Sequence, residues 1–167
     1  MLKIEIRRML ATEVAFVADL YARSISGLLH GILKPEQIRT DDEYCGYFAG
    51  VVSHEHEVWV AVLDGPPVGV LAMADEWIEQ LYVDPPEQRR GVGSALLAHG
   101  KALSPDCLRV LTLQRNTVAC RFYERHGFAA YAHGLSPPPE NEPDVSYQWR
   151  PHQTSKAGTR RRLPTGS

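Results

Sequence analysis

The chain has 167 residues, a length that suits one domain with a hydrophobic core and is short for two. Hydrophobic residues make up 44% of the sequence and charged residues 23%, which is an ordinary globular profile. The formal net charge of -2 at pH 7 excludes a general electrostatic attraction to nucleic acid or to anionic membranes.

The three cysteines are Cys45, Cys107 and Cys120, an odd and scattered set that favours free thiols in a reducing compartment. His54 and His56 are spaced like a pair of metal ligands, but the glutamates interleaved with them indicate a solvated turn. The N-terminal residues lack the apolar core of a signal peptide, and no apolar run approaches the ~20 residues of a membrane span. We therefore expect a cytoplasmic protein with no metal, no membrane and no nucleic-acid partner.

The first elements are read from periodicity and capping signals. Residues 2–7 alternate apolar and charged side chains, as a half-buried strand does. A helix is expected after Thr12 and ends near residues 24–27, followed by a loop or short turns. Thr40 and Glu43 form a capping box, which predicts the start of a second helix.

The rest of the chain alternates between strands and helices. Further strands are expected at residues 57–63, 68–74, 78–83, 107–113, 128–131 and 145–149. Asp84-Pro85-Pro86 ends one of them, because proline cannot donate to a sheet ladder. Helices are expected from residues 91–94 to about Lys101, and from 117 to 126 after the N-cap Asn116. This order predicts an α/β (α+β) mixed sheet with helices on both faces.

The domain is expected to cover residues 1–150. The remaining residues, 151–167, are polar, basic and glycine-bearing, and are interpreted as a disordered tail. No internal repeat interrupts the domain.

Residues 78–97 combine a strand, a glycine-bearing loop and a helix N-terminus. Unpaired backbone N–H groups and the helix dipole favour an anion at such a terminus, and Gly91 and Gly93 let the backbone approach a phosphate closely. No Lys-Ser or Lys-Thr follows these glycines, which excludes a P-loop, and Leu96 replaces the third glycine of a dinucleotide-binding loop. The pattern that remains, QxxGxG, covers residues 88–93.

Placed after LYVDPP and before SALL, this pattern resembles the coenzyme A pyrophosphate loop of the GNAT superfamily of N-acetyltransferases. Residues 116–128, NTVACRFYERHGF, are similar to the NxxAxxFYExxGF pattern of the same superfamily. Asn116 and Tyr123 lie seven positions apart and therefore on one helix face. The resemblance covers nearly the whole chain. It implies the GNAT fold, with six to seven mostly antiparallel strands, and a poorly characterised bacterial-type member.

The resemblance also implies acetyl-coenzyme A (acetyl-CoA) as cosubstrate. Its pyrophosphate would be bound, chiefly by backbone N–H groups, at Gln88, Arg89, Arg90, Gly91, Val92, Gly93 and Ser94. Its pantetheine arm would pair with the backbone of Leu81, Tyr82 and Val83. Asn116 would hydrogen-bond the pantetheine as well as cap its helix.

Two residues are expected to take part in catalysis. Tyr123 resembles the general acid that protonates the departing thiolate, since a phenol is protonated at neutral pH; the alternative is plain packing. Glu79 is the candidate general base for the acceptor amine. Glu76, Asp75 and water are its alternatives.

The expected activity is direct transfer of acetyl to a primary amine in a ternary complex. The acceptor is not identified, although Glu140, Glu142 and Asp144 hint at a cationic small molecule or peptide terminus. Two other functions stay open: an acyl-CoA-binding module that has lost its chemistry, and an interaction protein whose basic residues 156–162 contact nucleic acid. A homodimer is also left open.

Overall fold

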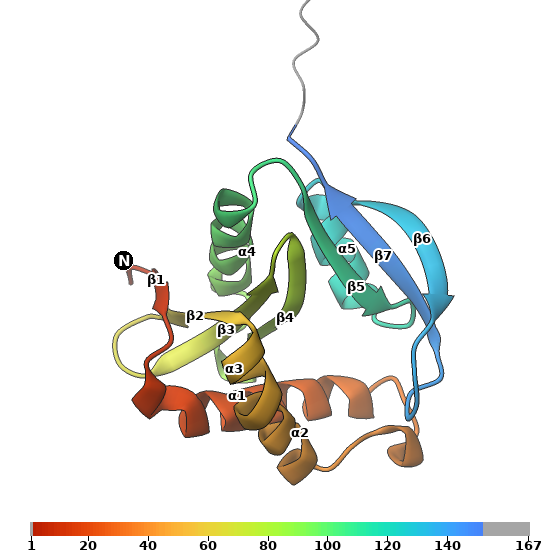
Figure 1. The fold of residues 1–167 in the computed structure, drawn as a ribbon, viewed down its shortest axis with the longest axis horizontal. Helices are drawn as coiled ribbons and strands as arrows, with labels where there is room; N and C mark the ends of the chain where they lie inside the picture. The colour runs from red at the N-terminus through yellow and green to blue at the C-terminus, as the bar shows by residue number, and fades with distance from the viewer. Residues whose placement is uncertain (1, 152–167) are drawn as a thin grey trace, which may run out of the picture.

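The computed structural model describes residues 2–151. Its centre is a seven-stranded sheet in the order β1-β2-β3-β4-β5-β7-β6 (Figure 1). The strands are β1 (Glu5–Arg8), β2 (Glu57–Val62), β3 (Pro67–Ala74), β4 (Trp77–Val83), β5 (Leu108–Leu113), β6 (Ala129–Leu135) and β7 (Pro143–Trp149). All neighbours are antiparallel except β4 and β5, which are parallel. The expected mixed, mostly antiparallel sheet is confirmed.

Helices cover both faces of this sheet. They are α1 (Val14–His30), α2 (Asp41–Tyr47), α3 (Ser53–Glu55), α4 (Val92–Leu103) and α5 (Thr117–Arg125), with 3₁₀ turns η1 (Ala11–Glu13), η2 (Pro35–Gln37) and η4 (Pro85–Glu87) and a π-helical turn η3 (Phe48–Val52). On β3, Val70 and Ala72 pack with α1 and α2, whereas Leu71 and Met73 pack with α4 and α5. This alternation follows from the two-residue period of a strand, and it gives the protein two hydrophobic cores.

The helical region after β1 differs in part from expectation. The predicted end of the first helix near residues 24–27 is wrong, because α1 continues to His30. Glycine inside a helix costs about 1 kcal/mol relative to alanine, and burial of side chains such as Leu20 and Leu29 offsets this cost at Gly27. Thr12 is no N-cap but lies inside η1.

The capping box at the second helix is confirmed. Thr40 Oγ1 accepts a hydrogen bond from Glu43 N at 3.2 Å, and Glu43 Oε2 accepts one from Thr40 N at 2.7 Å. Helical structure then continues through η3 and α3 as far as Glu55. His54 therefore lies on a helix rather than in the expected turn.

The β6–β7 hairpin is longer than the sequence suggested. β6 extends to Leu135, because His133 and Gly134 pair with Val145 and Asp144 of β7. β7 begins at Pro143, and proline is tolerated at the first residue of a strand. The connecting loop shrinks to residues 136–142.

The position of the site is set by a separation between β4 and β5. Their pairing is limited to Trp77 with Arg109 and Ile78 with Val110, and both strands run on beyond this point. In the β3–β4 register, Ala72 faces Gln80 and Met73 faces Ile78, so Glu79 is the extra residue of a β-bulge. Bulges re-aim a side chain locally and are common beside active sites.

No helix within residues 2–151 is long and apolar enough to cross a membrane. The basic residues 156–162 lie outside the described residues, as does the expected tail apart from Pro151. The domain boundary near residue 150 stays a prediction.

Candidate active site

A cavity of about 720 Å³ occupies the gap where β4 and β5 part. It is lined by β4, the loop before α4, β5, α5 and one face of α1. The sequence-predicted residues that line it are Glu79, Leu81, Tyr82, Val83, Gln88, Arg89, Gly91, Gly93, Ser94, Asn116 and Tyr123. Arg90 and Val92 are not among its lining residues.

The loop before α4 has the backbone of an anion site. Arg89 and Gly91 both have left-handed φ angles, 63° and 83°, whereas Arg90 between them does not. When left-handed and right-handed residues alternate in this way, successive backbone N–H groups point into one concave surface that can bind an anion. Gly91 is the N-cap of α4 and supplies no side-chain cap, so the first N–H groups of the helix lack that partner. A Cβ at Gly93 would make only ordinary contacts, at 3.6 Å to Phe122, so packing does not require glycine there.

Two residues of the predicted loop face elsewhere. Arg90 forms an ion pair with Glu87 and lines a separate hollow beside Leu2 and Pro66. Val92 is buried in the core under α4. Any contact of these two residues with a ligand in the cavity would therefore come from their backbone.

The free edge of β4 forms a second part of the site. Leu81, Tyr82 and Val83 pair with β3 on one side, and the side toward β5 faces the cavity instead of a strand. Gln88 Nε2 donates to Val83 O at 3.1 Å, which closes the end of this edge. An unpaired strand edge can bind an extended ligand that carries amides.

Asn116 and Tyr123 line the opposite wall on α5. Asn116 Oδ1 accepts a hydrogen bond from Ala119 N at 3.1 Å, so the predicted cap is confirmed. The Tyr123 ring is packed edge-on by Phe122 at 5.2 Å and Phe128 at 5.3 Å, and its hydroxyl has no hydrogen-bond partner among the described residues. Burial raises the pKa of Tyr123, so the phenol keeps its proton at neutral pH.

Of the three candidate carboxylates, only Glu79 lines the cavity. Its side chain is exposed there, at the β-bulge of β4. Glu76 is held by Arg109 at 3.0 Å, and Asp75 lies in the β3–β4 turn with a φ of 51°. Among these three carboxylates, geometry therefore favours Glu79 as the group that can accept a proton from a bound molecule, and water stays an alternative.

The sequence did not indicate several other residues of the cavity wall. Ser24 and Leu28 come from α1, Leu111 from β5, and Arg125 from the last turn of α5. No local motif marks them, because their position depends on how α1 and α5 dock on the sheet. Arg125 could have been suspected, since it lies two residues after Tyr123, and it adds a second guanidinium near Arg89 at the cavity.

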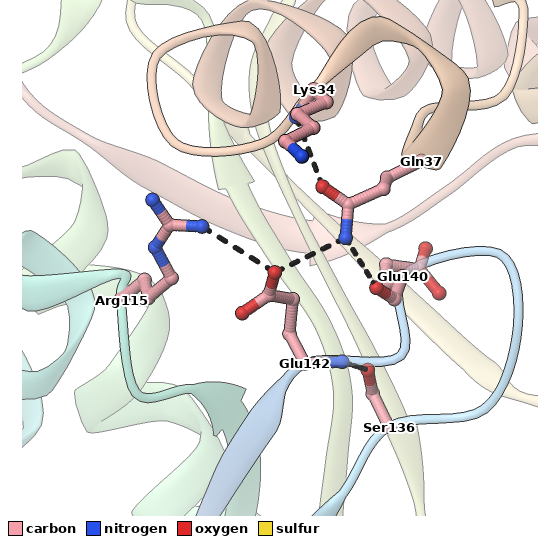
Figure 2. Close-up of polar contacts among 6 residues, drawn as sticks. All are labelled: Lys34, Gln37, Arg115, Ser136, Glu140 and Glu142. Carbon is pink, nitrogen blue, oxygen red and sulfur yellow. Dashed lines mark hydrogen bonds and ion pairs between the residues drawn. The ribbon is translucent and has the colours of Figure 1, made fainter.

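Side-chain bonds fasten the β6–β7 loop to η2 (Figure 2). Gln37 Nε2 donates to Glu140 O at 2.6 Å and to Glu142 Oε1 at 3.1 Å, and Arg115 forms an ion pair with Glu142 at 3.4 Å. The Gln37 side chain is itself held by Lys34 N, which donates to its Oε1 at 3.0 Å. Glu142 thus has partners within the fold, which weakens the expectation that it binds a cationic acceptor.

Part of the chain is similar to known proteins. Residues 54–130 match the model of the acetyltransferase (GNAT) domain family. The matched residues make up just under half of the chain, so this part of the sequence is similar to the GNAT family. No group of three or more potential metal ligands occurs among the residues that the structure describes.

Two curated relatives are similar to this chain over part of its length. The uncharacterised N-acetyltransferase YafP of Escherichia coli is 42% identical over 72 residues, which are 43% of this chain and 45% of YafP. The peptidyl-lysine N-acetyltransferase YjaB of Salmonella typhimurium is 36% identical over 75 residues, 44% of this chain and 51% of YjaB. The alignments span about half the length of these relatives.

The fold is shared with a solved N-acetyltransferase structure. The PaiA N-acetyltransferase of Thermoplasma acidophilum, in complex with coenzyme A, has a TM-score of 0.69 at 16% identity. The match covers 89% of this chain and 99% of the PaiA chain. At that identity the likeness establishes the fold alone.

Proposed function

We propose that this chain is a GNAT acetyltransferase that transfers the acetyl group of acetyl-CoA to a primary amine by direct transfer in a ternary complex. One observation carries the proposal: a single cavity joins an anion-binding loop, a free strand edge, a protonated phenol and a carboxylate. These four features match the pyrophosphate, the pantetheine, the leaving thiolate and the acceptor amine.

The donor binds along the cavity. Its pyrophosphate lies at the concave backbone of residues 88–94 and the N-terminus of α4, with Arg89 adding positive charge. Its pantetheine amides pair with the free edge of β4 at residues 81–83, beside Asn116. This places the thioester near the β-bulge at Glu79. The peptidyl-lysine activity in the name of YjaB is consistent with an amine acceptor.

The reaction proceeds by attack of the amine nitrogen on the thioester carbonyl carbon. The backbone N–H of Leu81 polarises the carbonyl oxygen, because the register with β3 turns the N–H of Tyr82 toward Val70. Glu79, directly or through water, takes the proton that the nitrogen loses, and the C–S bond breaks as Tyr123 gives its proton to sulfur. Solvent then removes the proton from Glu79 and reprotonates Tyr123. An acceptor that arrives as an ammonium ion gives up one further proton to solvent before the attack.

The alternative is a non-catalytic acyl-CoA-binding module with the same fold. It would need only the loop and the strand edge, and it gives no reason for Glu79 and Tyr123 to line the same cavity. The enzyme hypothesis uses all four features and is therefore preferred.

Release of free thiol from acetyl-CoA, measured across a panel of primary amines, tests the proposal. We expect amine-dependent release, reduced about a hundredfold in Glu79→Gln and at least about tenfold in Tyr123→Phe. Glu76→Gln is the matched control, because Glu76 is paired with Arg109 and lies off the cavity. Acetyl-CoA binding without amine-dependent release from any amine would support the binding module instead.

A further inference from the structure

The α1 helix closes one side of the cavity with the face that carries Ser24 and Leu28. These residues are four positions apart and so lie one above the other on the helix. Tyr21, one turn earlier, packs edge-on against Tyr82 of β4 with ring centroids 5.5 Å apart. The same face of α1 therefore rests on β4, the strand that carries Glu79.

Ser24 is an unusual residue within this wall. Its side chain is only 5% exposed, and its Oγ has neither a hydrogen-bond partner among residues 2–151 nor contact with solvent. Other helical serines in the protein are paired: Ser26 Oγ lies 3.3 Å from His30 Nδ1, and Ser53 Oγ donates to Ala49 O at 2.6 Å. A buried hydroxyl without a partner costs stability, so its presence calls for an explanation.

The same cavity is lined by two more side-chain hydroxyls without partners. Neither Tyr82 nor Tyr123 makes a side-chain hydrogen bond in the described part of the chain, and both line the cavity. Burial raises the pKa of each phenol, and for Tyr82 the neighbouring Tyr123 adds to the shift, so both are neutral. Leu28 and Leu111 provide apolar surface in the same cavity.

We propose that Ser24 is an acceptor-binding residue, whose Oγ accepts a hydrogen bond from the amine nitrogen beside Glu79. This role requires a turn about the Cα–Cβ bond to another staggered rotamer, because the Oγ has no exposed surface in the structure. The acceptor is a primary alkylamine, with methylene groups next to the nitrogen packed against Leu28 and Leu111. The inference rests on the proposed function and deepens it.

The neutrality of Ser24 suits this role. A hydroxyl oxygen can accept a hydrogen bond from a neutral amine, and the amine keeps its lone pair for the attack. The wall thus separates two tasks. Ser24 positions the nitrogen, and Glu79, on the facing strand, takes the proton.

Steady-state kinetics with n-butylamine and acetyl-CoA test the inference in Ser24→Ala and Ser24→Cys. We expect Ser24→Ala to raise KM for n-butylamine about tenfold and to leave KM for acetyl-CoA within about twofold. Ser24→Cys keeps the volume but bonds weakly, so it should fall between Ser24→Ala and the wild type. The melting temperature of Ser24→Ala should be unchanged or higher, because the variant removes an unpaired buried hydroxyl.

Ser26→Ala is the matched control, since Ser26 is buried on the same helix but lies off the cavity. It should leave both KM values unchanged. Two results would overturn the inference and leave the proposed function standing. One is wild-type kinetics in Ser24→Ala, and the other is a lower melting temperature of this variant with an equal loss of affinity for both substrates. If the wild type binds acetyl-CoA but acetylates neither n-butylamine nor any other amine, the proposed function fails, and the inference fails with it.

Discussion

Arg23 and Asp84 form a two-pronged ion pair, with Nε 3.0 Å from Oδ1 and Nη2 2.8 Å from Oδ2. Arg23 precedes Ser24 on α1, and Asp84 follows the last residue of β4. The pair therefore connects the wall assigned to the acceptor with the start of the loop assigned to the donor. The carboxylate raises the pKa of Arg23, which stays charged.

Loss of this pair should affect catalysis more than stability. Both side chains keep some contact with solvent, so Arg23→Ala should lower the free energy of unfolding by only about 0.5–1 kcal/mol. Because α1 would lose its connection to the donor loop, we expect kcat/KM for the amine to fall about fivefold. Denaturant unfolding and steady-state kinetics measure the two effects. Arg8→Ala, which breaks an exposed pair with Glu57, should leave the kinetics unchanged.

Neighbouring arginines in the donor loop should behave differently. Arg89 lines the cavity, whereas Arg90 is paired with Glu87 outside it. We expect Arg89→Ala to raise KM for acetyl-CoA about tenfold through loss of a charge-assisted contact with phosphate, and Arg90→Ala to change it less than about twofold. Equal effects of the two substitutions would show that charge alone, rather than position, matters.

Removal of the Tyr123 hydroxyl should lower kcat without weakening the binding of acetyl-CoA. Tyr123→Phe should lower kcat about 10- to 100-fold without changing KM for acetyl-CoA, since thiolate is already a fair leaving group. Because burial raises the pKa of Tyr123, the wild type should lose no activity through its ionisation up to about pH 10. A pH–rate profile checks this point. Tyr131→Phe, on the exposed strand β6, is the control.

The hydrogen bonds in Figure 2 can be tested by introducing a charge that breaks one of them and then adding a second substitution that restores it. Gln37→Glu keeps the shape but places a carboxylate against Glu142 Oε1, so it should lower the free energy of unfolding by about 1–2 kcal/mol. Adding Glu142→Gln restores a donor–acceptor pair and should recover at least half of that loss. Both are measured by denaturant unfolding. Failure of rescue would show that Gln37 acts through Glu140 O instead.

His99 should make the fold sensitive to mild acid. The centroid of its ring lies 4.2 Å from that of Trp59, and its Nε2 is buried without a hydrogen-bond partner in the described region. Burial lowers the pKa of His99. Below the unfolded value of 6.5, the unfolded chain takes up a proton that the folded chain refuses, so stability falls as the pH decreases. Denaturant unfolding between about pH 7.5 and 5.5 measures the slope. His99→Gln should flatten it.

The loop proposed to bind the donor and two helix caps could be predicted from local patterns. The loop at residues 88–94 and the caps at Thr40 and Asn116 are short-range features, in which a few residues determine the backbone. The end of α1 was mispredicted because glycine lowers helix propensity locally, while long-range burial of Leu29 extends the helix.

The acceptor side could not be predicted in the same way. Ser24 and Leu28 reach the cavity only because α1 docks on β4, and the bulge at Glu79 appears only in the register between β3 and β4. Arg89 and Arg90 are adjacent and chemically alike in the sequence. They face different surfaces because Arg89 has a left-handed backbone conformation and Arg90 forms an ion pair with Glu87.

Calorimetric titration with acetyl-CoA tests the central claim, that the cavity between β4 and β5 is the donor site. We expect saturable binding with one site per chain, competition by coenzyme A, and affinity weakened about tenfold in Arg89→Ala but not in Arg90→Ala. Absence of binding, together with no rise in melting temperature at millimolar acetyl-CoA, would contradict the account.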